Sequence, residues 1–255
     1  MNANLIYFSA TDNTKIIIKE IAAQLSEQQR EFNITLPEGR KQDFSFGADD
    51  VILVGVPVYS GRVPKFLLPT LHNISGNGAM AVCIVTYGNR EYEDALLELK
   101  DICEEAGCRV IAAGAFLGEH SYTDFLAKMR PDKADIQIAR DFGTQIKGKL
   151  EADILDSLQV HGNFPYVEKP KATNQFAPIT SETCISCGLC EQNCPMGAVH
   201  KEDFKEVDAS RCIHCCCVKK CPVHAKTFPQ DEFLAIKNWL ETNFSKQKEM
   251  PELFL

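Results

Sequence analysis

Two cysteine-rich runs near the end of the chain have the residue type and spacing that iron binding requires. The first follows the pattern C-x2-C-x2-C-x3-C-P, and the second repeats most of it. The cysteines of the first run are Cys184, Cys187, Cys190 and Cys194, and those of the second are Cys212, Cys215, Cys217 and Cys221. Each 4Fe–4S cluster needs four thiolate ligands, and this spacing is typical of proteins that hold two such clusters. The sequence therefore predicts two 4Fe–4S clusters and one-electron redox chemistry.

The proline after each run predicts how the ligands are shared between the clusters. Three closely spaced cysteines wrap one cluster, whereas the fourth, just before the proline, ligates the other cluster. The first cluster would then be bound by Cys184, Cys187, Cys190 and Cys221, and the second by Cys212, Cys215, Cys217 and Cys194. This crossing would tie the two segments together.

The second run departs from the pattern because three cysteines are consecutive at 215–217. We assign Cys217 as the third ligand since it keeps the x3 spacing to Cys221; Cys216 is then spare, or takes its place. Two structural zinc ions are the alternative, because paired C-x2-C motifs also bind zinc. We favour iron, since zinc sites do not usually need the third cysteine and the following proline. We expect free thiols rather than disulfides, because the N-terminal sequence shows no secretion signal.

Upstream of the cysteines, short apolar runs alternate with helical patterns over about 150 residues. Apolar runs predict strands at 5–8, 32–36, 51–56, 81–86 and 110–117, and helical spacing predicts helices at 17–25, 63–71, 92–106 and 133–150. This alternation predicts a doubly wound α/β domain with a five-stranded parallel sheet. Ligands of such sheets bind at the loops beyond the carboxyl ends of the strands.

Three of these loops carry residues suited to a phosphorylated aromatic ligand. The loop 9–14 is rich in hydroxyl side chains and opens a helix, whose N-terminus attracts anions. The loops 57–64 and 86–92 each place a tyrosine and a glycine at a strand end, where a ring can stack on a flat heterocycle and the backbone can approach it. A helix cap or plain packing explains each feature alone equally well. Together, in a chain with iron–sulfur clusters, they predict a flavin.

The chain resembles the flavodoxin–ferredoxin fusion proteins of anaerobic bacteria and archaea over nearly its whole length. YFSATDNT at 7–14 resembles the flavodoxin phosphate loop, and PVYSGRVP at 57–64, VTYGNREY at 85–92 and GAFLGEHSY at 114–122 resemble the loops around the flavin ring. The resemblance implies FMN as the ligand, bound by Ser9, Thr11, Asn13, Thr14, Pro57, Tyr59, Ser60, Gly61, Thr86, Tyr87, Gly88 and Asn89.

Two further residues near this site need an interpretation. Asp12 stands where the family usually has glycine, and its charge would weaken phosphate binding unless it points outward or is paired. We interpret His120, beside Glu119, as an ordinary polar loop residue, with contact to the flavin as the alternative.

The whole chain fits a cytoplasmic protein of two folded units. We predict a flavodoxin-like domain at 1–158, a linker at 159–180, a small α+β two-cluster ferredoxin domain at 181–229, and a C-terminal helix and tail at 230–255. A net charge of −8 without a basic patch argues against nucleic acid, and no apolar run is long enough to predict a membrane span. We expect docking with other redox proteins.

The predicted function is electron transfer between FMN and two 4Fe–4S clusters, as a carrier between protein partners. We assign no catalytic residues, because the sequence shows no general base, nucleophile or nicotinamide-binding glycine motif. One alternative is a flavin-dependent reductase of a small substrate, which would show saturable turnover. Another is a non-catalytic iron–sulfur redox sensor, in which oxidation would change partner binding or oligomeric state.

Overall fold

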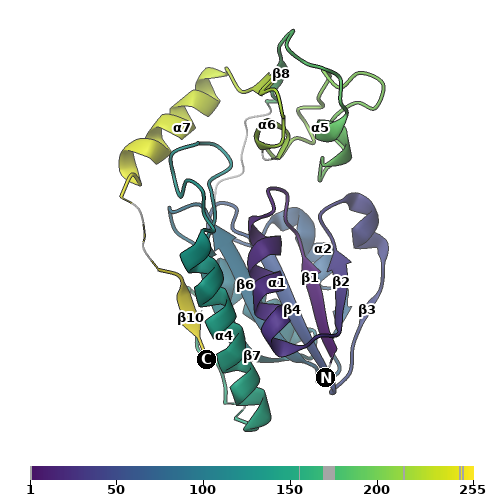
Figure 1. Ribbon diagram of the computed structural model, residues 1–255, viewed down its shortest axis with the longest axis vertical. Coiled ribbons are helices and arrows are strands. Elements are labelled where there is room, and N and C mark those ends of the chain that lie inside the picture. Colours follow the sequence, from purple (N-terminus) through teal and green to yellow (C-terminus); the bar gives the residue numbers. More distant parts are fainter. Residues whose placement is uncertain (1, 155, 169–175, 215, 247, 249) are drawn as a thin grey trace.

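A twisted sheet lies between two layers of helices, and a smaller unit sits above one end of it (Figure 1). The computed structural model describes residues 2–154, 156–168, 176–214, 216–246, 248 and 250–255. The strands of the main sheet are β1 (Asn2–Tyr7), β2 (Gln29–Asn33), β4 (Asp50–Pro57), β6 (Met80–Tyr87), β7 (Arg109–Leu117) and β10 (Glu252–Phe254).

The strand order is β10-β7-β6-β4-β1-β2, and the five strands from β1 to β7 all run parallel. Counted along the chain, these five strands have the order 2-1-3-4-5, which is the flavodoxin-like version of the doubly wound sheet. The predicted fold class is therefore confirmed. The sheet also has a sixth strand, β10, which pairs antiparallel with β7 and was not predicted.

Burial on both faces explains why the central strands form. β4 and β6 are buried along nearly their whole length, as continuous apolar runs in parallel sheets are. On one face pack α1 (Asn13–Leu25) and α4 (Lys133–Glu151), and on the other α2 (Leu68–Leu71) and α3 (Ala95–Glu105). Figure 1 shows α1 and α4 side by side in front of the sheet.

Two predicted elements differ from the observed ones. The second strand was predicted at 32–36, but β2 is Gln29–Asn33, because its polar residues pair with β1 through the backbone at the sheet edge and only Phe32 is buried. The helix predicted at 63–71 is split into a 3-10 turn, η2 (Lys65–Leu67), and the single-turn α2. The remaining short elements of this domain are η1 (Pro37–Lys41), β3 (Phe44–Ser45) and β5 (Ile74–Ser75).

The smaller unit contains both cysteine runs, and we call its described residues within 176–229 the cysteine module. Its elements are β8 (Ile179–Thr180), α5 (Leu189–Gln192), α6 (Cys216–Lys219) and β9 (Lys226–Thr227). β8 and β9 pair antiparallel, which brings the start and the end of the module together. The chain then continues into α7 (Asp231–Asn243).

The segment before the module runs along the flavodoxin-like domain. Leu158, the last residue of the predicted flavodoxin-like domain, is buried in the core. The buried carboxylate of Asp94 accepts the backbone N–H groups of Asn163 and Val167, at 2.9 and 2.7 Å. Burial works to raise the pKa of Asp94, but these hydrogen bonds outweigh it and lower that pKa.

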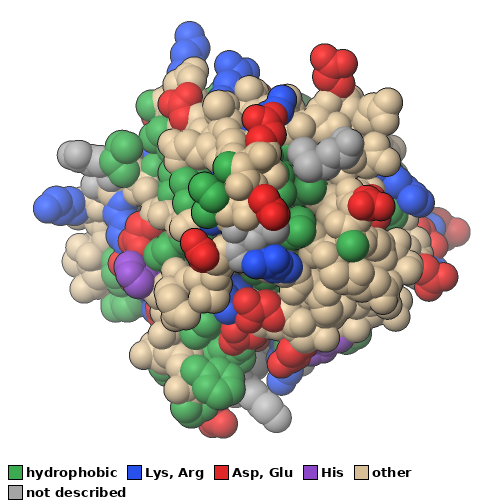
Figure 2. Space-filling model, turned by 90° about the horizontal axis from the view of Figure 1, so that it is seen from below, with side chains coloured by type: hydrophobic (Ala, Val, Ile, Leu, Met, Phe, Trp, Pro, Cys, Tyr) green, Lys and Arg blue, Asp and Glu red, His purple; other side chains and the backbone are tan. Residues whose placement is uncertain are grey.

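The segment after α7 returns to the same domain and ends in β10. β10 covers the edge of β7 and is fixed there by a hydrogen bond from the Tyr92 hydroxyl to the Glu252 carboxylate. The cysteine module is therefore tied to the domain at both of its ends. Figure 2 shows the face opposite the module, where acidic and basic side chains are interspersed.

None of the described helices is both long and apolar enough to cross a membrane.

Asp94→Asn should lower the free energy of unfolding by about 1–3 kcal/mol at pH 7, since the amide group places a donor against N–H donors. The native pKa of Asp94 lies below that of the unfolded chain. The advantage of the wild type should therefore shrink as the pH falls through about 4. Denaturant unfolding of both proteins at several pH values measures this difference.

The control is Asp141→Asn, because the only side-chain hydrogen bond that the Asp141 carboxylate accepts from the described residues comes from the exposed Gln137 amide. A loss of stability as small as that of the control would contradict the role given to Asp94.

Candidate functional site

A cavity of about 460 Å³ lies between the carboxyl ends of the strands and the cysteine module. The loops after β1, β4, β6 and β7 line it, as expected for the ligand site of a doubly wound sheet. Ten residues predicted as FMN ligands are among the lining residues: Ser9, Thr11, Asn13, Thr14, Pro57, Tyr59, Ser60, Thr86, Tyr87 and Gly88. The volume is typical of cofactor sites.

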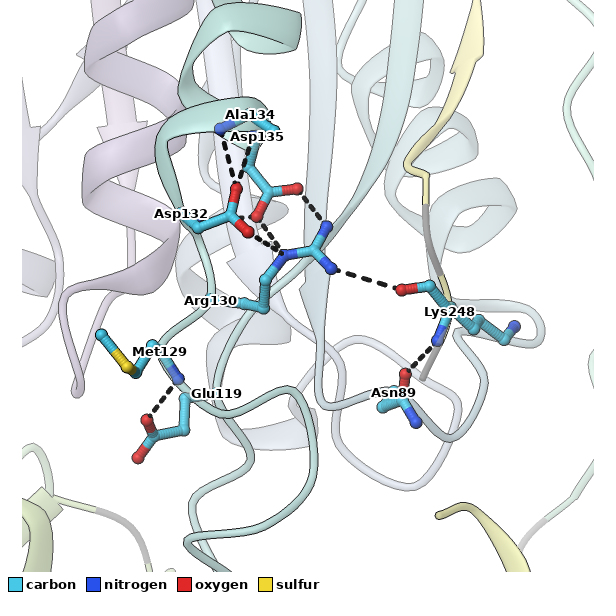
Figure 3. Close-up of polar contacts among 8 residues, drawn as sticks. All are labelled: Asn89, Glu119, Met129, Arg130, Asp132, Ala134, Asp135 and Lys248. Atoms are coloured by element: carbon cyan, nitrogen blue, oxygen red, sulfur yellow. Dashed lines mark hydrogen bonds and ion pairs between the residues drawn. The ribbon is translucent and has the colours of Figure 1, made fainter. Parts of the chain in front are cut away.

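Gly61 and Asn89, the other two predicted ligands, are not among the residues that line this cavity. Gly61 has a φ of 79°, and a Cβ there would lie 2.4 Å from a carboxylate oxygen of Glu93, so the turn itself requires glycine. The buried Asn89 amide donates to the carbonyls of Phe244 and Lys246 and accepts the Lys248 N–H at 2.8 Å (Figure 3). Asn89 therefore holds the segment that follows α7.

One end of the cavity is the N-terminus of α1, whose first N–H groups have no acceptor within the helix. The Ser9 hydroxyl accepts the Lys15 N–H at 3.0 Å and so fixes the loop to the helix. The Thr14 and Thr86 hydroxyls lie 2.7 Å apart, which joins the first turn of α1 to the end of β6. Hydroxyls and a helix N-terminus at one place suit a phosphate group.

Asp12, the departure from the family pattern, has the backbone conformation that favours glycine. Its φ is 68°, and aspartate is one of the few other residues that adopt this conformation readily. Its carboxylate does not cap α1 but lies 3.0 Å from Nζ of Lys220 in the cysteine module. The charge is thus both paired and directed to the neighbouring unit.

The two predicted tyrosines line another part of the cavity. Tyr59 is half-buried and packs edge-on against Phe8, with ring centroids 6.5 Å apart. Tyr87 is 3% exposed and packs edge-on against Tyr92. Burial raises the pKa of Tyr87, and its hydroxyl has no hydrogen-bond partner among the described residues. Tyr87 therefore stays a neutral phenol, and both tyrosines add aromatic surface to the site.

His120 lies in the cavity wall against Gly88, where a Cβ would be 2.4 Å from its ring. Its Nδ1 accepts the Tyr122 N–H at 3.1 Å, so a neutral ring carries its proton on Nε2. Burial, together with the charges of Lys219 and Arg90, lowers the pKa of His120 to about 4. His120 is therefore a neutral donor in the wall of the site, which is the position that our alternative interpretation requires.

Residues from the C-terminal third of the chain complete the cavity, and sequence reasoning did not identify them. Ile213 comes from the cysteine module, and Ile236, Trp239 and Leu240 come from α7. The spacing of the three α7 residues places them on one face of that helix. In the sequence, this apolar face indicated that α7 packs against another part of the protein. It did not indicate that this part is the first cavity.

A second cavity is lined by four cysteines: Cys184, Cys187, Cys190 and Cys221. These four are the predicted ligands of the first cluster, including the cysteine from the second run. The Cys221 thiol accepts the Ala225 N–H at 3.2 Å, and the Cys194 thiol accepts the Ala198 N–H at 3.1 Å. The same hydrogen bond at the same offset shows that the two runs are a structural repeat.

The other predicted ligand group is only partly described, because Cys215 lies outside the described residues. Cys217 interacts electrostatically with Cys212 and Cys194. Burial raises the pKa of the Cys217 thiol, and it raises that of the Cys212 thiol to about 11. Cys216 lies beside them, and its thiol donates to the Asn193 carbonyl at 3.2 Å. Within the described residues, no three His, Cys, Asp or Glu side chains are grouped as a single metal ion requires.

Three cations connect the cysteine module to the rim of the flavodoxin-like domain. Arg40 donates to the Pro195 carbonyl at 2.7 Å, just after the first cysteine run. Lys219 donates to the Glu119 carboxylate at 2.8 Å, and Lys220 pairs with Asp12. The module is therefore held against the loops that form the first cavity.

An aromatic cluster lies beside these contacts. Phe176, Phe228 and Phe233 pack together and against Tyr122, which lines the first cavity. The Tyr122 hydroxyl lies 3.2 Å from Nδ1 of the His214 ring. The backbone N–H of His214 donates a hydrogen bond to the Cys212 thiol at 3.4 Å. The first cavity and the second cysteine group are thus joined by a few consecutive contacts.

The comparisons with known proteins match the two parts separately. Residues 177–200 match the family described as the 4Fe-4S binding domain, which covers the first cysteine run. No curated protein matches the chain. This chain joins a flavodoxin-like domain to a 4Fe–4S binding segment. That architecture supports a redox role in electron transfer.

Solved structures resemble the flavodoxin-like domain. A flavodoxin from the domain Archaea is 18% identical, with 59% of this chain and 99% of that chain covered and a TM-score of 0.42. The rubredoxin oxygen:oxidoreductase of Desulfovibrio gigas is 13% identical, with 61% and 37% covered and a TM-score of 0.43. A flavodoxin of Fusobacterium nucleatum, bound to flavin mononucleotide, is 16% identical, with 58% and 98% covered and a TM-score of 0.40. The fold assignment itself rests on the strand order of the sheet.

His120→Gln should remove part of the acid sensitivity of this protein. The pKa of His120 is about 4 in the native state and about 6.5 in the unfolded chain, so between these values the unfolded state binds the extra proton. The free energy of unfolding of the wild type should therefore fall by up to about 3 kcal/mol more than that of the variant between pH 7 and pH 4. Anaerobic denaturant unfolding at several pH values measures the two curves.

His72→Gln is the control, because it removes a histidine outside the cavity lining. Parallel curves for the wild type and His120→Gln would contradict a neutral, half-buried His120.

Proposed function

We propose that this protein is a cytoplasmic electron carrier in which FMN occupies the first cavity and two 4Fe–4S clusters occupy the cysteine groups. The observation that carries the proposal is the shared wall of the first cavity. Ile213 lines that cavity beside the flavin loops and directly follows Cys212, a predicted cluster ligand. A ligand in the cavity would thus touch the neighbour of a cluster ligand, which supports direct electron exchange.

The residues present fit FMN. The N-terminus of α1 and the hydroxyls of Ser9, Thr11 and Thr14 would bind the phosphate. Tyr59 and Tyr87 would orient the ring, and His120 would offer its Nε2 proton to a polar atom of the ligand. The apolar side chains of α7 would exclude water from it. Bound FMN supplies one- or two-electron exchange.

The cysteine groups fit 4Fe–4S clusters. We name the cluster of Cys184, Cys187, Cys190 and Cys221 the outer cluster, and that of Cys194, Cys212, Cys215 and Cys217 the inner cluster. The lining of the outer site supports the predicted crossing of ligands. Cys217 is our choice over Cys216, because the Cys216 thiol is already engaged with the Asn193 carbonyl. Iron binding would deprotonate the ligand thiols. Burial otherwise raises the pKa of the thiols of Cys190, Cys212 and Cys217.

The placement of the two sites supports an order for the electron path. The inner group adjoins the FMN cavity through Ile213, whereas the outer site shares no described lining residue with that cavity. Cys187 of the outer group is exposed, and Ile185 beside it is 61% exposed. We therefore propose the path from FMN through the inner cluster to the outer cluster, which would meet a redox partner protein.

Anaerobic purification followed by metal, sulfide and flavin analysis tests the cofactors. We expect about eight irons and one FMN per chain. Zinc in place of iron would overturn the cluster assignment. Saturable turnover of a small acceptor without any redox protein would favour the reductase alternative, and a partner affinity that changes with oxidation while electron throughput stays negligible would favour the sensor.

Cys190→Ser should damage the outer cluster and spare the inner one, and Cys194→Ser should do the reverse, because the crossing assigns these ligands of one run to different clusters. Iron counts and low-temperature electron paramagnetic resonance of the dithionite-reduced variants separate the two signals. Cys83→Ser, which changes a buried cysteine of the sheet, is the control. Loss of the same signal in both ligand variants would contradict the crossing.

Light-driven reduction of FMN, frozen at successive times, tests the order. In Cys190→Ser the FMN should still reduce the inner cluster, whereas in Cys194→Ser the outer cluster should stay oxidised. Reduction of the outer cluster at the wild-type rate in Cys194→Ser would contradict the proposed path.

A further inference from the structure

Asp12 introduces a negative charge beside the proposed phosphate site. It directly precedes α1 at the turn from β1, and its neighbours Thr11 and Asn13 both line the cavity. A carboxylate at this position repels a phosphate and reduces the attraction from the helix N-terminus. Glycine would adopt the same φ of 68° without adding a charge, so the backbone does not require aspartate.

The charge of Asp12 is balanced from the cysteine module and from nowhere else among the described residues. Lys220 Nζ lies 3.0 Å from Asp12 Oδ2. Lys220 itself is held inside the module: its Nζ lies 3.2 Å from Asn193 Oδ1, and its N–H donates to the Cys216 carbonyl. Lys220, a residue of the second cysteine run, thus contacts Asn193 of the first run, and its position depends on the two runs being folded together.

A second contact leads from the same part of the module to the same loop. Lys219 donates to the Glu119 carboxylate at 2.8 Å and to the Thr123 carbonyl at 2.9 Å. The Glu119 carbonyl in turn accepts the side-chain N–H of Asn13 at 3.1 Å. Lys219 and Lys220 lie just before the proposed cluster ligand Cys221. Lys220 contacts the phosphate loop directly, and Lys219 contacts it through the loop after β7.

We propose that the Asp12–Lys220 ion pair couples FMN binding to the assembly of the cysteine module, so that the protein binds flavin tightly only once its clusters are in place. The inference rests on the proposed function, since it takes the cavity as an FMN site. Without clusters, no iron bridges join the two runs, Lys220 is no longer held, and Asp12 is left as an unpaired charge beside the phosphate. By linkage, bound FMN would stabilise the assembled module to the same degree.

The test is a double-mutant cycle on flavin affinity, measured by fluorescence in flavin-free, cluster-loaded, full-length protein. Lys220→Ala should weaken FMN binding about tenfold when Asp12 is present, because a carboxylate several ångströms from the phosphate is then unpaired. In the Asp12→Asn background, the same change should weaken FMN binding less than about twofold. Iron counts accompany each variant.

Riboflavin and a distant lysine supply the controls. Riboflavin lacks the phosphate, so Lys220→Ala should leave its affinity nearly unchanged. Lys205→Ala removes a module lysine that pairs with Glu182 instead, and should leave FMN affinity unchanged. Equal losses for FMN and riboflavin in Lys220→Ala, or no loss for FMN, would overturn the inference.

A second measurement avoids any change in the module. When iron is removed by chelation, the FMN affinity of the wild type should fall about tenfold more than that of Asp12→Asn. Equal falls would overturn the inference and leave the FMN site itself standing. Failure of the wild type to bind FMN in any form would overturn both the proposed function and the inference.

Discussion

The position of the cysteine module depends on its attachment to the flavodoxin-like domain at both ends. Before the module, Asp94 binds the backbone at Asn163 and Val167. After it, Asn89 binds the backbone at Phe244, Lys246 and Lys248, and β10 adds a strand to the sheet (Figure 3). A unit held in this way cannot swing freely on a linker. The side of the first cavity that Ile213 and α7 form is therefore a fixed part of the site.

The forces that dock the module have different sizes. The side chains of Phe176, Phe228 and Phe233 are each more than 90% buried, and burial of such a side chain stabilises by about 1.5–3 kcal/mol. A partly exposed ion pair such as Asp12–Lys220 contributes about 0–1 kcal/mol. The aromatic cluster therefore stabilises the packing of the module and α7 more than one such ion pair does, and Tyr122 is its contact with the flavodoxin-like domain. The ion pairs instead determine the orientation of the module, because they select which groups face each other across the contact. They also set the charge around the phosphate loop.

Both proposed cofactor sites are built from segments that are distant in the sequence. The outer cysteine group includes Cys221 from the second run, and the first cavity includes Ile213 from the cysteine module. Each site is then complete only when the other segment is in place. The proposed electron path needs such mutual dependence, because the two proposed sites keep a constant separation only if neither unit can move away alone.

Much of the fold and the site followed from local patterns. Apolar runs and helical periodicity determined the five parallel strands and the layers of helices, because buried strands and helix faces impose these periods directly. The spacing of the cysteines determined the cofactor class, and strand-end loops identified ten residues that line the cavity. These features depend on neighbours in the chain, so they could be read from it.

Only the tertiary structure decided the rest. β10 has three residues and no pattern of its own; it forms because β7 offers an open edge. Asn89 binds a segment more than 150 residues later in the chain, and the partner of Asp12 is a lysine from the other unit. Neither contact has a periodicity or a motif. Contacts of this kind arise when separately folded surfaces meet, so no local stretch of sequence contains them.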